Sequence, residues 1–286
     1  MQTYKRGLFL IFGSALCLST SGIGVRLIEN ADGWQILFYR CLTMIVFVGL
    51  VLFVRKGQSI EMRIKNFKKD DLVLAFVLGT SFMAYIFALL ETTIANAMFV
   101  FSSAPFFAAI FGWVILKEKV AARTWMAIAA AATGLMIMVG AGLIGGRFLG
   151  NLISLWLPLS YAISIVLVRR SKQPDMLLAL FVGAIIACLL TIPFVENFMI
   201  SKVDFGVSIY LGLSVGAGFT LFILGSRYVP AAQVGLIALV EPVLAPIWAW
   251  IFVSETPVQT TLVGGVIILL AVGTDGVISV IRSLRK

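Results

Sequence analysis

Residues 232–242 read AQVGLIALVEP, and residues 95–105 read ANAMFVFSSAP, a second version of the same stretch 137 positions upstream. The shift brings prolines, glutamates and side-chain amides into register, and these residue types are scarce in a chain this apolar. The aligned pairs are Gly79 with Gly216, Tyr85 with Phe222, Ala95 with Ala232, Asn96 with Gln233, Pro105 with Pro242 and Glu118 with Glu255. This register predicts that the chain is built from two related halves.

The composition places both halves in a membrane. Hydrophobic residues make up 61% and charged residues 12% of the 286 positions, with a mean hydropathy of +1.08, whereas soluble domains have about 45–50% apolar and about 25% charged residues. Because a membrane helix takes about 20 residues, about ten spans fill the chain and leave no room for a soluble domain. The predicted spans are 7–28, 34–54, 72–90, 95–116, 123–143, 150–168, 175–195, 207–226, 232–253 and 259–281.

The basic residues predict the orientation of these spans. With the N-terminus inside, the inner segments contain 18 of the 22 Lys and Arg residues, whereas the outer connections contain only Arg147 and Lys202. Positive charge collects on the cytoplasmic side of membrane proteins. We therefore expect a multi-pass protein of the plasma membrane, most consistent with a bacterial inner membrane, with both termini in the cytoplasm.

Five spans per half is an odd number, so the halves run in opposite directions through the membrane. We expect an all-α polytopic membrane protein of about ten transmembrane helices, with one five-helix repeat in residues 1–145 and a second, inverted repeat in residues 146–286. Inverted repeats form a central cavity near the bilayer midplane and open it to one side at a time. This plan favours transport over catalysis.

Three sequence elements form a recognisable set: the arginine of WQILFYR at residues 34–40, the stretch 95–105 that runs on to LKEK at 116–119, and its second copy, which runs on to SE at 254–255. Together they resemble the EamA-type branch of the drug/metabolite transporter (DMT) superfamily. The resemblance covers essentially the whole chain. It implies two inverted five-helix halves around a cavity for a small metabolite, and members include amino-acid exporters. Glu91 departs from the family pattern, which has a neutral residue before the first stretch.

Glu241 lies in the middle of the ninth predicted span, next to Pro242. Proline removes a helical hydrogen bond and lets the chain kink or unwind, and Pro105 is expected to do the same in the fourth span. An ionisable group at this depth is a candidate functional residue. Glu241 is expected either to bind a cation, a proton or a substrate ammonium, or only to form a hydrogen bond to a neighbouring helix at the kink.

Arg40 lies too deep in the second predicted span to reach the interface easily. Its planar guanidinium suits bidentate binding of a substrate carboxylate, and it equally suits a permanent ion pair that fixes helix packing. The resemblance implies an arginine here in carriers of unlike substrates, which favours the structural or gating role. The sequence leaves both roles open.

The remaining charged candidates lie near span ends. Arg26 and Glu91 are close to the outer ends of their spans, where they are expected to reach lipid head groups or to pair with each other as an outer gate. Glu118 and Glu255 follow equivalent helix ends, and we expect them to order the connecting loops or to take part in gating. Asp275 is expected to reach the interface or to make a local contact.

Uncharged side chains supply further candidates for the cavity. Gly212 and Gly216 have the spacing of a close helix–helix contact, which by itself indicates packing. The residues expected to bind substrate or to take part in coupling, beyond Arg40 and Glu241, are Asn96, Gln233, Tyr85, Phe101 and Trp156.

The chain contains no histidine and three widely spaced cysteines. His-based acid–base catalysis, Ser-His-Asp triads and imidazole zinc sites are therefore excluded, and no G-x-x-x-x-G-K-[ST] segment is present for ATP hydrolysis. We expect no cofactor, no metal site and no enzyme activity. Lipid head groups beside the spans explain the net charge of +9, so nucleic-acid binding is not expected.

These inferences favour a secondary active transporter of a small metabolite. Arg40 and Glu241 offer both charge signs inside the membrane, so an amino acid or related zwitterion is the first candidate substrate. A proton or sodium ion is the expected coupling ion, membrane lipid is the expected surrounding, and the protein is expected to work as a monomer or a homodimer. The alternatives are a passive facilitator or channel of the same fold and an intramembrane lipid-modifying enzyme.

Overall fold

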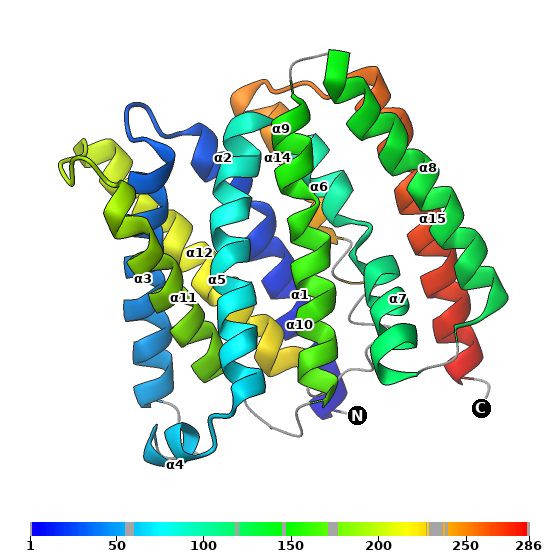
Figure 1. The fold of residues 1–286 in the computed structure, drawn as a ribbon, viewed down its shortest axis with the longest axis horizontal. Coiled ribbons are helices and arrows are strands. Elements are labelled where there is room, and N and C mark those ends of the chain that lie inside the picture. The colour runs from blue at the N-terminus through cyan, green and yellow to red at the C-terminus, as the bar shows by residue number, and fades with distance from the viewer. Residues whose placement is uncertain are drawn as a thin grey trace.

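The computed structural model is a bundle of helices (Figure 1). It describes residues 2–54, 60–117, 120–144, 147–170, 177–226, 228, 237 and 240–284, and every regular element within these residues is helical. The elements are α1 (Gln2–Ser19), α2 (Ser21–Arg26), α3 (Gly33–Val54), α4 (Ile60–Lys65), α5 (Lys69–Glu91), α6 (Ile94–Phe101), α7 (Ala104–Leu116), α8 (Ala122–Ile144), α9 (Phe148–Ser154), α10 (Trp156–Arg170), α11 (Leu177–Thr191), the 3-10 helix η1 (Ile192–Phe194), α12 (Lys202–Ser226), α14 (Val240–Val253) and α15 (Gln259–Leu284).

The predicted all-α fold with about ten transmembrane helices is confirmed. Among the described residues, three shorter apolar helices, Ala122–Ile137, Phe148–Ser164 and Val240–Val253, accompany seven segments that are long and apolar enough to cross a membrane. The seven segments are Tyr4–Arg26, Gly33–Val54, Lys69–Glu91, Ile94–Ile115, Leu177–Phe194, Lys202–Gly225 and Gln259–Ile278.

The 137-residue register of the sequence recurs in the backbone. α7 ends at Leu116 and α14 ends at Val253, and the next residues, Lys117 and Ser254, have φ angles of 57° and 54°. Within the described part of the chain, these two are the only residues other than glycine with positive φ. A left-handed residue is a common way to end a helix, so the two halves end the same helix with the same backbone corner.

The largest helix contacts join the first half of the chain to the second. α12 packs against α1 and α3 in one part of the bundle, α5 packs against α9, α10 and α11 in the other, and α8 pairs with α15. Glycines allow the closest approaches: a Cβ atom at Gly212 would lie 2.6 Å from the carbonyl oxygen of Arg40, and one at Gly183 would lie 2.8 Å from that of Ala75. The close helix contact expected at Gly212 is confirmed.

Three of the spans contain a break between two helices. The sequence analysis predicted only the break beside Pro105. The breaks separate α1 from α2 at Thr20, α6 from α7 at Ser102, and α9 from α10 at Leu155. Pro105 lies in the first turn of α7, where its missing N–H costs no helical hydrogen bond. Pro242 is buried in the first turns of α14, and a second proline, Pro246, lies further inside that helix.

Hydroxyl groups occupy all three breaks. A bilayer supplies no water for backbone carbonyl groups that lose their helical partner at a break. Ser and Thr side chains can replace that water by donating hydrogen bonds to nearby carbonyl oxygens. The bonds run from Ser19 to Leu16 (2.8 Å), Thr20 to Cys17 (2.9 Å), Ser21 to Leu18 (2.7 Å), Ser102 to Phe99 (2.6 Å), Ser103 to Val100 (2.6 Å) and Ser154 to Asn151 (2.8 Å).

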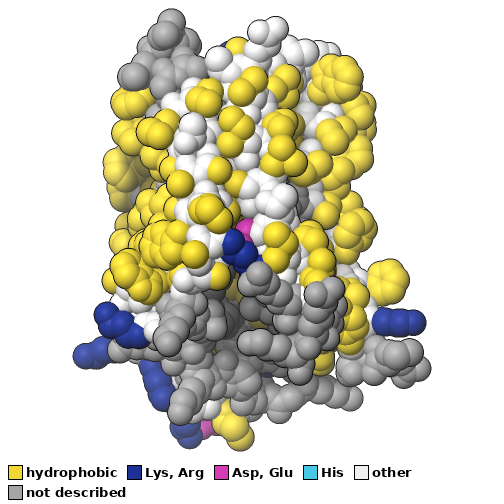
Figure 2. All heavy atoms as spheres, turned by 90° about the vertical axis from the view of Figure 1, so that its right-hand side faces the viewer, with side chains coloured by type: hydrophobic (Ala, Val, Ile, Leu, Met, Phe, Trp, Pro, Cys, Tyr) yellow, Lys and Arg dark blue, Asp and Glu magenta, His cyan; other side chains and the backbone are white. Residues whose placement is uncertain are grey.

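The bundle has two distinct ends and an apolar side. Both termini and α4 lie at the lower end in Figure 1, while α2 and the connection from α14 to α15 lie toward the opposite end, which we call the far end. Figure 2 shows the side on which α8 and α15 lie, where hydrophobic side chains cover most of the described surface. Met126, Met136 and Leu270 are 69%, 67% and 62% exposed, as expected for a surface that faces lipid.

Candidate functional site

Arg40 on α3 is buried inside the bundle, with 2% of its surface exposed. Its guanidinium carbon lies 5.2 Å from the ring centroid of Tyr85 and 5.8 Å from that of Phe82, and Nη1 donates to the carbonyl oxygen of Phe82 at 3.4 Å. Among the described residues, Nε has no hydrogen-bond partner and no carboxylate forms an ion pair with Arg40. The permanent ion pair expected of a structural arginine is therefore not formed with these residues.

Tyr85 connects this arginine to another helix. Its hydroxyl oxygen lies 2.5 Å from Oγ of Ser21, which is 1% exposed and begins α2. The Tyr85 ring meanwhile faces the Arg40 guanidinium. One tyrosine thus contacts both the buried charge and the short helix that follows the break at Thr20.

Aromatic side chains from both halves of the chain surround this region. The ring centroids of Phe82 and Phe219 are 5.6 Å apart, those of Phe101 and Tyr161 are 5.5 Å apart, and those of Tyr161 and Phe222 are 6.1 Å apart. Edge-on and tilted contacts of this kind stabilise aromatic clusters. Of the predicted cavity residues, Phe101 takes part in these ring contacts, which we call the aromatic lining, and Tyr85 contacts the Arg40 guanidinium.

Glu241 reaches the same region from the second half. It lies in the first turn of α14, is partly buried, and is close enough to Tyr85 and Tyr161 to interact with them electrostatically. None of the ion pairs found among the described residues includes Glu241. The bundle therefore contains one basic and one acidic side chain that both lie near Tyr85 without forming an ion pair with each other.

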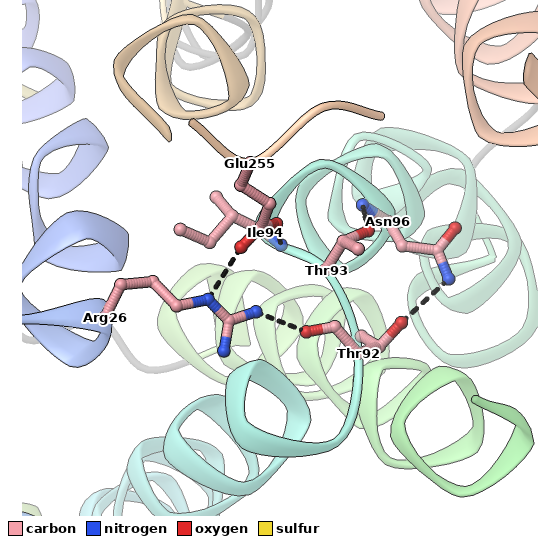
Figure 3. Close-up of polar contacts among 6 residues, drawn as sticks. All are labelled: Arg26, Thr92, Thr93, Ile94, Asn96 and Glu255. Atoms are coloured by element: carbon pink, nitrogen blue, oxygen red, sulfur yellow. Dashed lines mark hydrogen bonds and ion pairs between the residues drawn. The ribbon is translucent and has the colours of Figure 1, made fainter. Parts of the chain in front are cut away.

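The far end is held by a second polar arrangement (Figure 3). Nε of Arg26 lies 2.7 Å from Oε2 of Glu255, and Nη2 of Arg26 donates to the carbonyl oxygen of Thr92 at 2.7 Å. The other carboxylate oxygen of Glu255 accepts from the backbone N–H of Ile94 at 2.6 Å. These four residues, which we call the far-end clamp, join α2, the turn from α5 to α6, and the segment after α14.

The clamp corrects one prediction about the gate. Arg26 was expected to reach lipid head groups or to pair with Glu91, but its carboxylate partner is Glu255, and the side chain of Glu91 is exposed. The chain turns at Thr92, so the carbonyl group of Thr92 and the N–H group of Ile94 are available at the start of α6. Glu255 from the second half can then serve both the guanidinium and the helix N-terminus, where a negative charge is favourable.

Asn96 and Trp156, two further predicted site residues, form contacts between helices. Nδ2 of Asn96 donates to Oγ1 of Thr92 at 3.1 Å and to Oδ1 of Asn151, and its Oδ1 accepts from Thr261 at 3.2 Å. These bonds occupy both the NH2 group and the oxygen of a side-chain amide whose residue is 4% exposed. They join α6 to α9 through Asn151 and to α15 through Thr261. Nε1 of Trp156 donates to Oγ1 of Thr80 at 3.2 Å. Gln233 lies outside the described residues.

Asp275 and Glu118 are the remaining acidic candidates. Asp275 lies 3.2 Å from Nε of Arg123 and accepts from the Thr124 hydroxyl at 3.1 Å, so its partners lie on α8, with Thr124 151 positions away in the chain, and the expected local contact is not what the structure shows. Glu118 lies outside the described residues. No group of three His, Cys, Asp or Glu side chains suitable for a metal ion occurs in the part of the chain that the structure describes.

One buried carboxylate was not singled out from the sequence. Asp204 has no exposed surface and accepts from the backbone N–H groups of Glu29 at 2.8 Å, Asn30 at 3.2 Å and Ala31 at 3.2 Å. It therefore orders the connection from α2 to α3 and holds it against α12. An acidic residue in the first turn of a long apolar helix was the signal available in the sequence.

Gly150 positions the α5–α6 turn that the clamp uses. A Cβ atom at this position would lie 2.5 Å from the carbonyl carbon of Glu91 and 2.7 Å from the backbone nitrogen of Thr92. We expect Gly150→Ala to lower the free energy of unfolding by about 1–3 kcal/mol, because backbone atoms must move to admit the methyl group. Gly206→Ala is the matched control, since no atom lies within 4 Å of its added Cβ. Melting curves that match for the two variants would contradict the expected contact.

Comparison with known proteins identifies the family. The EamA-like transporter family matches residues 5–140 and again residues 148–274. The chain belongs to this family. It is also 25% identical to solute carrier family 35 member G1 of Homo sapiens. The alignment is 291 positions long and covers 93% of this chain and 77% of that protein. The predicted membership of the drug/metabolite transporter superfamily is confirmed.

Two further proteins are similar to this EamA-like transporter. An uncharacterized transporter of Archaeoglobus fulgidus is 30% identical over 196 residues, which cover 66% of this chain and 69% of that protein. A chain known only from a "Crystal structure of protein" has a TM-score of 0.69 at 16% identity and 99% coverage of both chains. The latter likeness shows the fold alone. The family membership and the apolar helices together make the protein a multi-pass membrane transporter.

Proposed function

We propose that the protein is a secondary active carrier that moves a small metabolite by alternating access, with an amino acid or related zwitterion as the substrate. The observation that carries this proposal is the presence of Arg40 and Glu241 near Tyr85, without an ion pair to each other or to another described residue. A substrate with its own carboxylate and ammonium complements both charges. The surrounding aromatic rings suit an apolar body between them.

Alternating access is supported by the helix breaks and by the clamp. The far-end clamp joins the two halves through Arg26 and Glu255, and α2, which carries Arg26, is separated from α1 by the break at Thr20. Breaking these contacts would remove the ion pair between α2 and the segment after α14 at that end, while α2 stays packed against α12 and α14. We propose that the far end faces outward, in line with the basic residues at the other end, and that both termini lie in the cytoplasm.

Counterflow in proteoliposomes tests the proposed function. Vesicles loaded with an unlabelled amino acid are diluted into a trace of the same labelled compound, across a panel of amino acids, nucleosides, polyamines and lipophilic cations. A carrier accumulates label transiently, because outward flux of the unlabelled compound drives exchange. Equilibration without transient accumulation would identify a passive facilitator or channel, and no flux of any compound would contradict the proposal.

Glu241 is the residue we propose for coupling to a proton or a sodium ion. We expect Glu241→Gln to insert and fold normally but to lower concentrative uptake at least tenfold and to remove its dependence on the coupling ion, because the amide has the size of the carboxyl group without its charge. Uptake is measured with imposed pH and sodium gradients. Glu61→Gln, a change at an exposed carboxylate on α4, is the control. Unchanged uptake and an unchanged pH profile in Glu241→Gln would contradict this role.

A further inference from the structure

We infer that Arg40 is the subsite for the carboxylate of the transported substrate, and that the Tyr85 ring covers it in the state that the structure describes. This inference rests on the proposed transport function and names the substrate class. The ligand is a small carboxylate with an apolar body, and its anionic group takes the place of the Tyr85 ring beside the guanidinium.

The charge balance of the arginines supports this assignment. Arg26 and Arg123 lie near the ends of their spans and each has a carboxylate partner, at 2.7 Å and 3.2 Å. Arg40 lies deeper, at 2% exposure, and its guanidinium contacts one carbonyl oxygen and two aromatic rings among the residues that the structure describes. Cation–π contacts only partly replace the solvation of a buried charge. A carboxylate would supply the missing counter-charge.

The free hydrogen-bonding capacity of Arg40 points to the same ligand. Nε has no partner although it is fully buried, and a guanidinium presents its donors in a planar fork that matches the two oxygens of a carboxylate. A nearby carboxylate of the protein would compete with such a ligand, but none of the described residues supplies one within ion-pair distance.

The cover over the subsite is linked to the far-end clamp. To leave the guanidinium, Tyr85 must break its 2.5 Å hydrogen bond to Ser21. Ser21 belongs to α2, the six-residue helix that also carries Arg26 of the clamp. Binding of a carboxylate at Arg40 therefore disturbs the helix that holds the far end, which gives the carrier a direct path from substrate binding to gating.

Matched ligands test the subsite. The shift in melting temperature of the purified protein is measured with the apolar α-amino acids, their amides, the corresponding amines, and carboxylates of the same chain length without an ammonium group. We expect free acids to raise the melting temperature by binding the folded state, and the amides to bind at least tenfold more weakly. An amide or amine that binds as tightly as its acid, or a panel in which no free acid binds, would overturn the inference.

Variants of Arg40 separate a binding role from a structural one. We expect Arg40→Met to abolish the shift caused by free acids while the melting temperature of the empty protein stays equal or rises, because a buried cation without a carboxylate partner is replaced by an apolar side chain. Arg40→Lys keeps the charge without the fork and should weaken acid binding at least tenfold. Arg123→Met is the matched control, and it should lower the melting temperature because it leaves Asp275 without the guanidinium.

The outcomes distinguish this inference from the proposed function. A lower melting temperature of empty Arg40→Met and Arg40→Lys with unchanged acid binding in either variant would make Arg40 structural and overturn the subsite. If the wild type shows counterflow of a neutral or cationic compound and Arg40→Met retains it, the carrier function stands and the subsite falls. If the wild type exchanges no compound, the proposed function itself fails.

Discussion

Reversing one charge of the far-end clamp, in Arg26→Glu or in Glu255→Arg, is expected to lower counterflow at least tenfold. Each variant puts two like charges where the structure has an ion pair at 2.7 Å between side chains that are 24% and 18% exposed. At about 4 Å and an effective dielectric constant of about 20, an attraction of about 4 kcal/mol becomes a repulsion of similar size. The far end can then no longer close.

The double variant Arg26→Glu/Glu255→Arg should recover part of the lost counterflow. Recovery stays incomplete because an arginine at position 255 cannot accept the hydrogen bond that Ile94 N–H donates to the native carboxylate. The exposed pair Glu61–Lys65 on α4, with side chains 76% and 72% exposed, provides the control. Its reversal should leave counterflow unchanged, since exposed ion pairs contribute about 0–1 kcal/mol.

An accessibility measurement shows whether the clamp acts as a gate. Phe101→Cys, in a background without the three native cysteines, places a thiol in the aromatic lining. We expect an impermeant maleimide added on the far side to label it faster in Arg26→Glu than with the native clamp. Equal labelling rates together with wild-type counterflow in the single reversals would show that the clamp is not a gate.

Asp204→Ala is expected to have the largest effect on stability. It removes a carboxylate that accepts three backbone hydrogen bonds in a place with no exposed surface. Hydrogen bonds to charged groups contribute about 1.5–3 kcal/mol each, so we expect a loss of at least about 3 kcal/mol. With a shift of about 2–4 °C for each kcal/mol in chains of this size class, the melting temperature should fall by about 6–12 °C.

The same connection offers a matched control for Asp204. Asp32 is exposed and accepts from the N–H groups of Trp34 and Gln35 at 2.8 Å and 2.9 Å, which is a helix cap. Asp32→Ala should cost only about 1 kcal/mol. Asp204→Asn should fall between the two alanine variants, because the amide retains one acceptor oxygen. Equal melting temperatures for Asp204→Ala and Asp32→Ala would show that the three bonds to Asp204 do not stabilise the fold.

The fold was predictable because its signals are periodic or compositional. Apolar runs of membrane length predicted the spans, and the register between Pro105 and Pro242 predicted two related halves. The same register appears in the backbone, because Lys117 and Ser254 both have positive φ angles. The breaks at Thr20 and Leu155 were not predicted. No proline lies near Thr20, whereas Pro158 lies three residues after Leu155, in the first turn of α10, and was not recognised as a signal. A few hydroxyl groups in an apolar run do not by themselves reveal that they bond to carbonyl groups of the preceding turn.

The site was predictable only in part, because partners depend on contacts between distant segments. Arg26 was singled out as a gate residue, but its partner Glu255 comes from a segment 229 positions away, while the nearer candidate Glu91 is exposed. Asn96 stood out as a polar residue of the repeat, yet its amide is used by neighbouring helices. Burial of Arg40 was expected, whereas only the structure shows that no carboxylate of the described residues pairs with it.

The unbalanced charge of Arg40 also makes the membrane voltage part of the transport cycle. A full elementary charge that crosses a membrane potential of 100 mV does electrical work of about 2.3 kcal/mol. Arg40 is buried in α3 without a carboxylate partner among the described residues, so any movement of α3 along the membrane normal carries charge through the field. The membrane voltage therefore changes the rate of each step in which Arg40 moves through the field. The driving force of a complete cycle still depends only on the net charge of the substrate and the coupling ion, because the fixed charge of Arg40 returns to its starting position.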